Sequence, residues 1–158
     1  MSDALILEVA DFEHDVLTGI YSEETGRPQP LRFTIQARLK VADRYEPDTP
    51  LSASKNYMDL KFAASEALPQ GVHFTLIEAV ADHICDTLFV QDERVEAVTV
   101  KIVKLAISEA GEKIGITLTR ERRGWSWCGS QACRTIRWKL PGCFTPNMRA
   151  ACAVRGQT

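Results

Sequence analysis

Residues 31–41 alternate between apolar and polar side chains, and this pattern limits the possible folds more than any other feature of the sequence. The apolar members of the alternation are Leu31, Phe33, Ile35, Ala37, Leu39 and Val41. Successive side chains of a β-strand point to opposite faces, so the segment predicts a strand with one face in the core and the other in water. A sheet with one wet face is typical of antiparallel strands that are covered on one side only.

Three other segments alternate in the same way, at residues 5–9, 98–103 and 114–118. We expect the first of them to end where the chain becomes irregular, around residues 11–13. The sequence therefore predicts two strands near its beginning and two more after residue 97, each pair close enough in the chain to form a hairpin.

The two pairs of strands are separated by segments with helical spacing. Apolar residues recur at this spacing over residues 58–63 and 77–89, and Thr75 stands three residues before Glu78, where the two side chains could form a capping box. The predicted order is β-β-α-α-β-β. This order favours an α+β fold, in which a four-stranded antiparallel sheet carries two helices on one face.

Charge divides the sequence into two parts. Residues 1–123 contain 14 Lys and Arg against 21 Asp and Glu, whereas residues 124–158 contain five basic residues and no acidic ones. The second part also holds all three tryptophans and four of the five cysteines, without the C-x2-C pairs of a zinc site. We expect residues 1–123 to be one domain, and residues 124–158 to be a basic, Trp- and Cys-rich tail that is disordered or a non-native extension.

The acidic domain argues against nucleic acid as the main partner, because such proteins usually carry a basic surface. No stretch approaches the ~18 apolar residues of a membrane-spanning helix, and the carboxylates within residues 1–15 are foreign to a secretory signal. His14, His73 and His83 are too scattered to predict a metal site. We expect a cytoplasmic protein with a small-molecule ligand and no membrane contact.

Four side chains could carry chemistry, and each also has an ordinary structural interpretation. Lys104 shares strand parity with Ile102, so it either reaches solvent from the rim of the sheet or is a partly desolvated acid/base. Glu78 either caps its helix or offers two acceptor oxygens to a ligand with two parallel N–H donors. Glu24 could be a solvated hairpin charge, and Tyr57 a half-buried anchor before its helix.

Taken in order, these segments resemble the dihydroneopterin aldolases of folate biosynthesis. The matching segments are GIYSEE at 19–24, the alternating strand at 31–41, NY at 56–57, FTLIEAVADHI at 74–84, VKIVK at 100–104 and IGITLTRER at 114–122. The resemblance implies a tunnelling fold, in which four subunits close their sheets into a barrel and two rings stack as an octamer. It covers nearly all of residues 4–122.

The resemblance also implies roles for single residues in a lyase that uses neither a Schiff base nor a metal or other cofactor. Glu78, with the backbone of Ile77, corresponds to the group that grips the pterin, and Lys104 to the acid/base. Tyr57 corresponds to a tyrosine from the adjacent subunit that handles a proton, and Glu24 to the acid that orders the lysine and a water. The implied products from dihydroneopterin are hydroxymethyl-dihydropterin and glycolaldehyde.

Two departures from the family and two alternatives stay open at this point. Leu105 follows Lys104 where many members have proline, and Lys55 stands where an apolar residue often supports the pterin. One alternative is the sister epimerase, acting on dihydroneopterin or its triphosphate. The other is a non-catalytic tunnelling-fold oligomer whose Trp-rich tail binds RNA or a protein partner.

Overall fold

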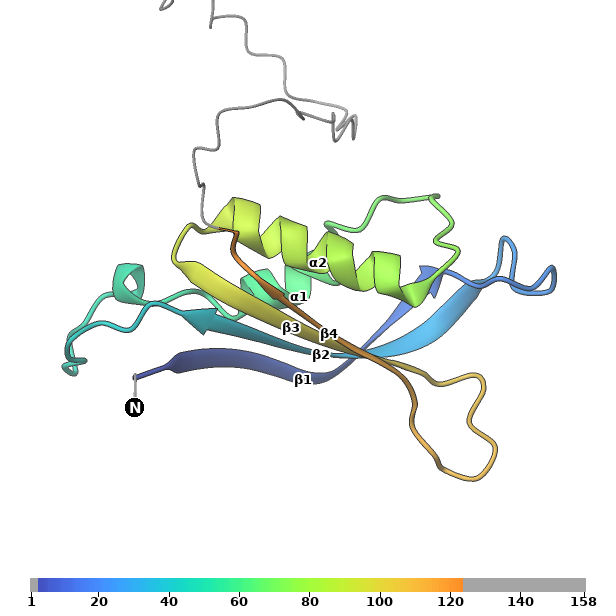
Figure 1. Ribbon diagram of the computed structural model, residues 1–158, viewed down its shortest axis with the longest axis horizontal. Helices are drawn as coiled ribbons and strands as arrows, with labels where there is room; N and C mark the ends of the chain where they lie inside the picture. Colours follow the sequence, from blue (N-terminus) through green and yellow to red (C-terminus); the bar gives the residue numbers. More distant parts are fainter. Residues whose placement is uncertain (1–2, 124–158) are drawn as a thin grey trace, which may run out of the picture. The chain divides into compact units, whose positions relative to one another are not determined.

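A computed structural model describes residues 3–123 of the chain (Figure 1). The expectations for residues 124–158 lie outside the described residues. Within the described part, no helix is both long enough and apolar enough to cross a membrane.

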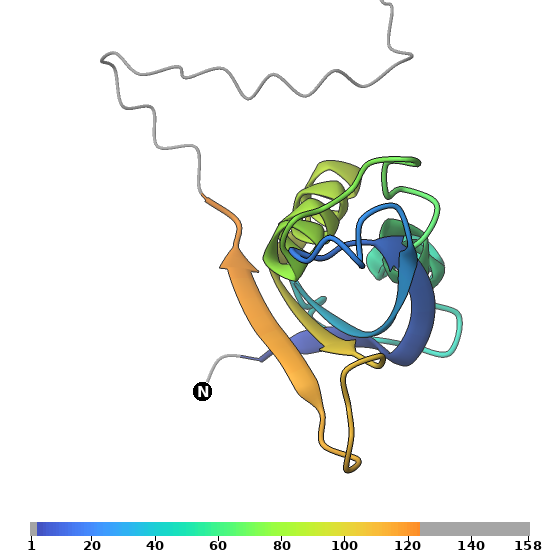
Figure 2. The ribbon, with the colours of Figure 1, turned by 90° about the vertical axis from the view of Figure 1, so that its right-hand side faces the viewer.

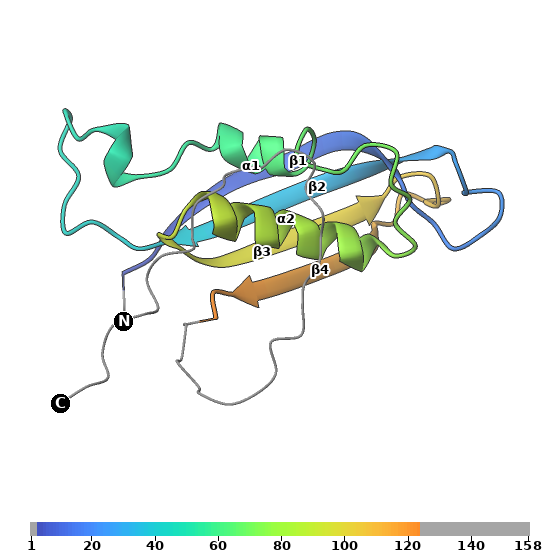
Figure 3. The ribbon, with the colours of Figure 1, turned by 90° about the horizontal axis from the view of Figure 1, so that it is seen from above.

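One antiparallel sheet forms the framework, with its strands in the order β1-β2-β3-β4. The elements along the chain are β1 (Leu5–Leu17), β2 (Pro28–Leu39), the short 3-10 helix η1 (Leu51–Ala53), α1 (Met58–Ala63), α2 (Ile77–Gln91), β3 (Val95–Lys104) and β4 (Ile114–Glu121). Both α-helices lie on the same face of the sheet (Figures 1 and 3). The predicted α+β fold and its element order are confirmed.

The core lies between the sheet and the two helices. The side chains of Leu31, Phe33, Ile35 and Ala37 on β2 are fully buried, as the alternation of this strand predicts. From the other side, α2 contributes a buried stripe that consists of Val80, Ala81, Ile84, Cys85 and Leu88. Removing this apolar surface from water is the main source of stability for a domain of this size.

β1 is longer than the sequence predicts, because it contains an irregularity in place of an end. Its pairing with β2 shifts register between Val9 and Phe12, and Asp11 has a positive φ of 54°. Such a bulge absorbs an extra residue and bends the strand while the hydrogen-bonded ladder continues beyond it. The expected break around residues 11–13 is therefore wrong, and the sheet is strongly curved along this strand (Figure 2).

The expected capping box at the start of α2 is also wrong. Leu76, and not Thr75, occupies the N-cap position, and no side chain makes a capping hydrogen bond there. Leu76 has extended backbone geometry, which starts the helix one residue later than the sequence pattern indicates. As a result, the carboxylate of Glu78 is not used within its own helix.

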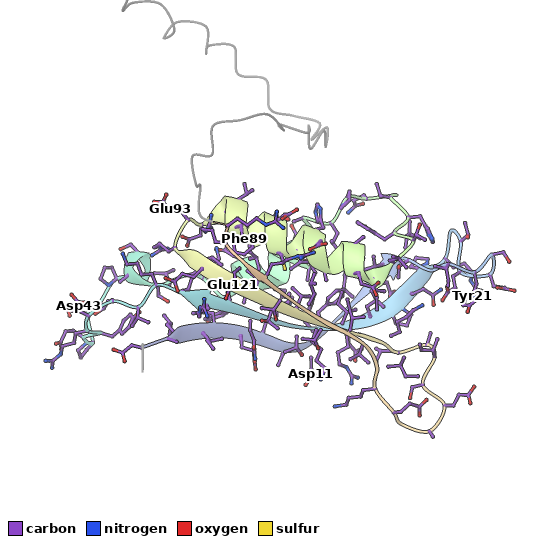
Figure 4. The ribbon with its side chains drawn as sticks, viewed as in Figure 1. Asp11, Tyr21, Asp43, Phe89, Glu93 and Glu121 are labelled. Carbon is purple, nitrogen blue, oxygen red and sulfur yellow. The ribbon has the colours of Figure 1, made fainter. Side chains whose placement is uncertain are left out.

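The opposite end of α2 is held by Arg122, which follows β4. Its guanidinium donates to the carbonyl oxygens of Phe89, Asp92 and Val95 at 2.9, 2.6 and 2.7 Å. It also lies 5.0 Å from the centroid of the Phe89 ring, a residue labelled in Figure 4. Because the last carbonyl groups of a helix have no partner within the helix, Arg122 supplies hydrogen bonds that water would otherwise provide.

Candidate active site

The turn between β1 and β2 folds around the side chain of Glu24. One carboxylate oxygen of Glu24, Oε2, accepts the backbone N–H groups of Ile20 and Tyr21 at 3.1 and 3.3 Å. Gly19 has a φ of 143°, and a Cβ at this position would overlap the Glu24 carboxylate. The turn therefore requires glycine at position 19, both for its backbone conformation and for the space that Glu24 occupies. Tyr21 lies at the exposed tip of the turn (Figure 4).

The other oxygen of Glu24 is paired with Lys104, at the end of β3. The Lys104 Nζ lies 3.0 Å from Glu24 Oε1, and the two side chains are only 18% and 14% exposed. The hydrogen bond from Lys104 is the main reason why the pKa of Glu24 lies below its ordinary value of 4.5, and the turn amides of Tyr21 and Ile20 contribute further. The structure thus brings together two of the predicted site residues, 80 positions apart in the chain.

The segment before α2 is hydrogen-bonded to the same turn. The N–H of Gly19 donates to the carbonyl of Phe74 at 3.1 Å, and the N–H of Phe74 donates to the carbonyl of Leu17 at 2.8 Å. The Nε2 of His73 lies 2.8 Å from the carbonyl oxygen of Gly19. Sequence reasoning missed His73, because a histidine far from other candidate residues carries no local signal of such a contact.

Glu78 and Ile77 occupy the first turn of α2, a few residues beyond this contact. Glu78 is exposed, and its carboxylate makes no hydrogen bond within residues 3–123. Ile77 is half-buried and packs against the core. Since the first N–H groups of a helix lack partners within the helix, the backbone here can donate to a ligand while Glu78 accepts from it.

Tyr57 makes no hydrogen bond to the Glu24–Lys104 pair. It is 62% exposed, directly before α1, and its hydroxyl has no hydrogen-bond partner among the described residues. The backbone beside it is held on both sides, since Asn56 Oδ1 accepts the N–H of Met58 at 2.9 Å and the buried Lys55 pairs with Asp59 at 2.9 Å. Lys55 therefore points into the protein, and its charge is not presented to a ligand.

Residues 3–123 contain no group of three or more His, Cys, Asp and Glu side chains that could hold a metal ion. The single cysteine of this part, Cys85, is buried in α2, and this burial, together with the nearby carboxylates of Asp82 and Asp86, raises its pKa to about 12. A thiol in that state is a poor nucleophile at neutral pH. Among the predicted site residues, the groups that remain for chemistry are the Lys104–Glu24 ion pair, the carboxylate of Glu78 and the exposed phenol of Tyr57.

Comparison with known proteins identifies the family. Residues 7–119 match the family model for dihydroneopterin aldolase (FolB), which is well over half of the chain. The chain belongs to the dihydroneopterin aldolase family. This membership makes it a lyase of folate biosynthesis that acts on a pterin, and it favours the aldolase over the alternatives. No curated protein sequence matches the chain significantly.

Solved structures of dihydroneopterin aldolases share the fold. The enzyme from Burkholderia thailendensis, bound to guanine, has a TM-score of 0.62 and 18% sequence identity, over 77% of this chain and 93% of that chain. The Escherichia coli dihydroneopterin aldolase, in complex with neopterin, has a TM-score of 0.59 and 18% identity, over 73% of this chain and 97% of that chain. These similarities establish the tunnelling fold for the described domain.

Proposed function

We propose that the aldolase activity of this chain is carried by Lys104, Glu24 and Tyr57, with the pterin held by Glu78 and Ile77. The observation that supports this proposal most strongly is the poorly exposed Lys104–Glu24 pair at the end of β3. An ion pair of this kind holds a transferable proton at a fixed place, which is what general acid/base catalysis needs.

The reaction needs proton transfer and orientation more than it needs an electron sink from the protein. Removal of the proton from the middle hydroxyl of the dihydroneopterin side chain, on the second carbon from the ring, breaks the bond between the first and second side-chain carbons and releases the outer two carbons as glycolaldehyde. The electron pair of that bond moves into the conjugated C=N group of the reduced pterin ring, giving an enamine. Protonation of the enamine carbon yields hydroxymethyl-dihydropterin, so neither a lysine Schiff base nor a metal is required.

Lys104 and Glu24 fit the proton-transfer part of this scheme. Glu24 is itself held by two backbone amides, so it fixes the position of the Lys104 ammonium without leaving the turn. Lys104 can then donate to, or accept from, the substrate directly or through a bound water. In the proposed reaction Lys104 is the acid/base, and Glu24 orders it.

Glu78 fits the binding part. A pterin presents a ring N–H and an exocyclic amino group side by side, and guanine presents the same edge. Glu78 leaves both carboxylate oxygens free to accept from such an edge, and the N–H of Ile77 lies in the same helical turn. The guanine in the Burkholderia enzyme and the neopterin in the Escherichia coli enzyme share this recognition chemistry.

The exposed, unpartnered hydroxyl of Tyr57 supports a site shared between subunits. In residues 3–123 the hydroxyl of Tyr57 meets no partner, while β1 and β4 each form one edge of the sheet. Pairing of these edges between neighbouring subunits gives a closed ring, and we propose that Tyr57 reaches the Lys104 of a neighbour in such a ring. The proposed assembly is an octamer of two stacked rings, in the cytoplasm.

The test is to incubate the purified protein with dihydroneopterin in the presence of EDTA and to identify the products. Glycolaldehyde together with hydroxymethyl-dihydropterin is the expected result, and borohydride should trap no covalent adduct. Recovery of an isomer of dihydroneopterin with inverted configuration would instead identify an epimerase. No conversion at all, with a protein that binds RNA only when residues 124–158 are present, would favour the non-catalytic oligomer.

A further inference from the structure

His73 contacts the peptide group that also holds Glu24. The carbonyl oxygen of Gly19, which binds His73 Nε2 at 2.8 Å, belongs to the same peptide unit as the N–H of Ile20, which binds Glu24 Oε2 at 3.1 Å. Because a peptide unit is planar, its carbonyl and its N–H point in opposite directions and turn together. The orientation that satisfies His73 is therefore the orientation that presents the N–H to Glu24.

The polarity of these contacts gives the chain of hydrogen bonds a direction. A carbonyl oxygen can only accept, so the Nε2 of His73 carries the hydrogen, while the buried Nδ1 has no partner among the described residues. His73 thus donates to the Gly19–Ile20 peptide, that peptide donates to Glu24, and Glu24 accepts from Lys104. The first two of these bonds run in the same direction, so they polarise and strengthen each other, while Lys104 donates to the other oxygen of the same carboxylate.

Glycine at position 19 allows the Gly19–Ile20 peptide to rotate away from this orientation and back. Gly19 has no Cβ and adopts a φ of 143°, so rotation of the peptide that follows it meets little steric resistance. A rotated peptide would turn its carbonyl oxygen toward the Glu24 carboxylate, where two oxygens repel each other. The bond from His73 stabilises the orientation in which the turn donates the N–H of Ile20 to the Glu24 carboxylate.

We propose that His73 is a positioning residue for the reaction, acting through the Gly19–Ile20 peptide to hold Glu24 against Lys104. This inference rests on the proposed roles of Glu24 and Lys104. It predicts an effect on the chemical step and little effect on pterin binding, because the carboxylate of Glu78 lies on α2 and takes no part in the hydrogen bonds of the turn within residues 3–123.

The chain offers a matched control in His83. Its Nε2 also lies 2.9 Å from a backbone carbonyl, that of Ala67, and it is half-buried like His73. Its bond fixes the connection between α1 and α2, and its ring, 6.4 Å from the ring of Phe74, makes no hydrogen bond to the turn of Glu24. The loss of a hydrogen bond from histidine to a backbone carbonyl can therefore be compared at His73 and at His83, and only the bond of His73 is connected to Lys104 through Glu24.

The experiment compares His73→Leu, His73→Gln and His83→Leu with the wild-type protein. Hydrogen–deuterium exchange of peptides that cover residues 17–24 reports on the turn, and steady-state kinetics with dihydroneopterin reports on turnover. In His73→Leu we expect amide exchange in the turn to be ~10-fold faster and kcat to fall ~10-fold, with KM within about twofold of wild type. His73→Gln, which keeps an N–H donor, should recover part of both losses, and His83→Leu should change neither.

The proposal is wrong if His73→Leu leaves kcat and exchange at the wild-type values, or if His83→Leu has the same effect on both. It is also wrong if the turn exchanges faster in His73→Leu while kcat is unchanged, since the turn would then be structural only. If the wild-type protein does not cleave dihydroneopterin, the proposed function fails. The exchange rates still decide in that case whether His73 holds the turn.

Discussion

Replacing Arg122 by methionine should destabilise the domain, because Arg122 joins the end of β4 to the C-terminal end of α2. The change removes three hydrogen bonds, to the carbonyls of Phe89, Asp92 and Val95, and the contact with the Phe89 ring. Methionine keeps the apolar stem of the side chain and removes the guanidinium. The effect therefore reports on the hydrogen bonds and the cation–π contact of the guanidinium, and not on burial of the stem.

The expected loss of unfolding free energy depends on how far the hydrogen bonds of Arg122 are exposed to water. Arg122 is half-buried, so water can replace part of each lost bond, and a net value of about 0.5–1 kcal/mol per bond applies. The cation–π contact adds about 0.5–1 kcal/mol. We expect the free energy of unfolding to fall by about 2–4 kcal/mol and Tm to fall by roughly 10 °C for a domain of this length.

The measurement is thermal and urea unfolding at one fixed protein concentration, since the Tm of a protein that assembles depends on concentration. Arg123→Met is the control, because Arg123 is exposed and makes no hydrogen bond within residues 3–123. A chain that ends at Arg123 should retain the stability of the domain, whereas a chain that ends at Glu121 should lose more than Arg122→Met, because it also lacks the apolar stem and the bond from the N–H of Arg122 to the carbonyl of Glu96 at 2.7 Å. Equal stability of Arg122→Met and Arg123→Met, within about 0.5 kcal/mol, would refute this reasoning.

Four further results are expected. Lys104→Ala should slow turnover by roughly two to four orders of magnitude with little change in ligand affinity, while Lys101→Ala, exposed on the other face, should stay near wild type in steady-state kinetics. Glu78→Ala should weaken neopterin binding in calorimetry by ~2–4 kcal/mol. The pKa of Glu24 in the folded protein lies below 4.5, so its contribution to stability is present above about pH 4.5 and is lost as the pH falls through the folded value. Glu24→Gln should therefore lower the free energy of unfolding at pH 7 and should no longer do so in stronger acid. Since the pKa of Cys85 is raised to about 12, iodoacetamide at pH 8 should alkylate Cys85 ~1000-fold more slowly than an ordinary thiol, as followed by peptide mass spectrometry.

The parts of the fold that depend on local alternation could be predicted from the sequence. The buried face of β2 follows from period two alone, and so does the inward parity of Lys104 at the end of β3. The order of the elements follows from the same patterns. These predictions needed no knowledge of what lies opposite each strand.

The errors and omissions depend on contacts between distant segments. The path of β1 through Asp11 requires pairing with β2, and a bulge looks like a break when only its own residues are considered. The bond between His73 and Gly19 joins positions 54 residues apart. The burial of Lys55 is a local exception, because its partner Asp59 is only four residues away and comes within reach when α1 forms. In each case the contact between two residues decides a conformation or a burial that the sequence pattern alone leaves open.

The bulge in β1 has a consequence for how copies of the chain assemble. If neighbouring subunits pair β1 with β4, every contact is head-to-tail, and such contacts give a closed ring or an endless fibre according to the rotation between copies. The bend at Asp11 contributes to that rotation, because it curves the edge that a neighbour must continue. If the proposed ring forms, removal of the extra residue would flatten this edge and open the ring. A chain with a straightened β1 should then grow into filaments that electron microscopy would detect. In that case the single irregular residue Asp11 limits the number of subunits in the assembly.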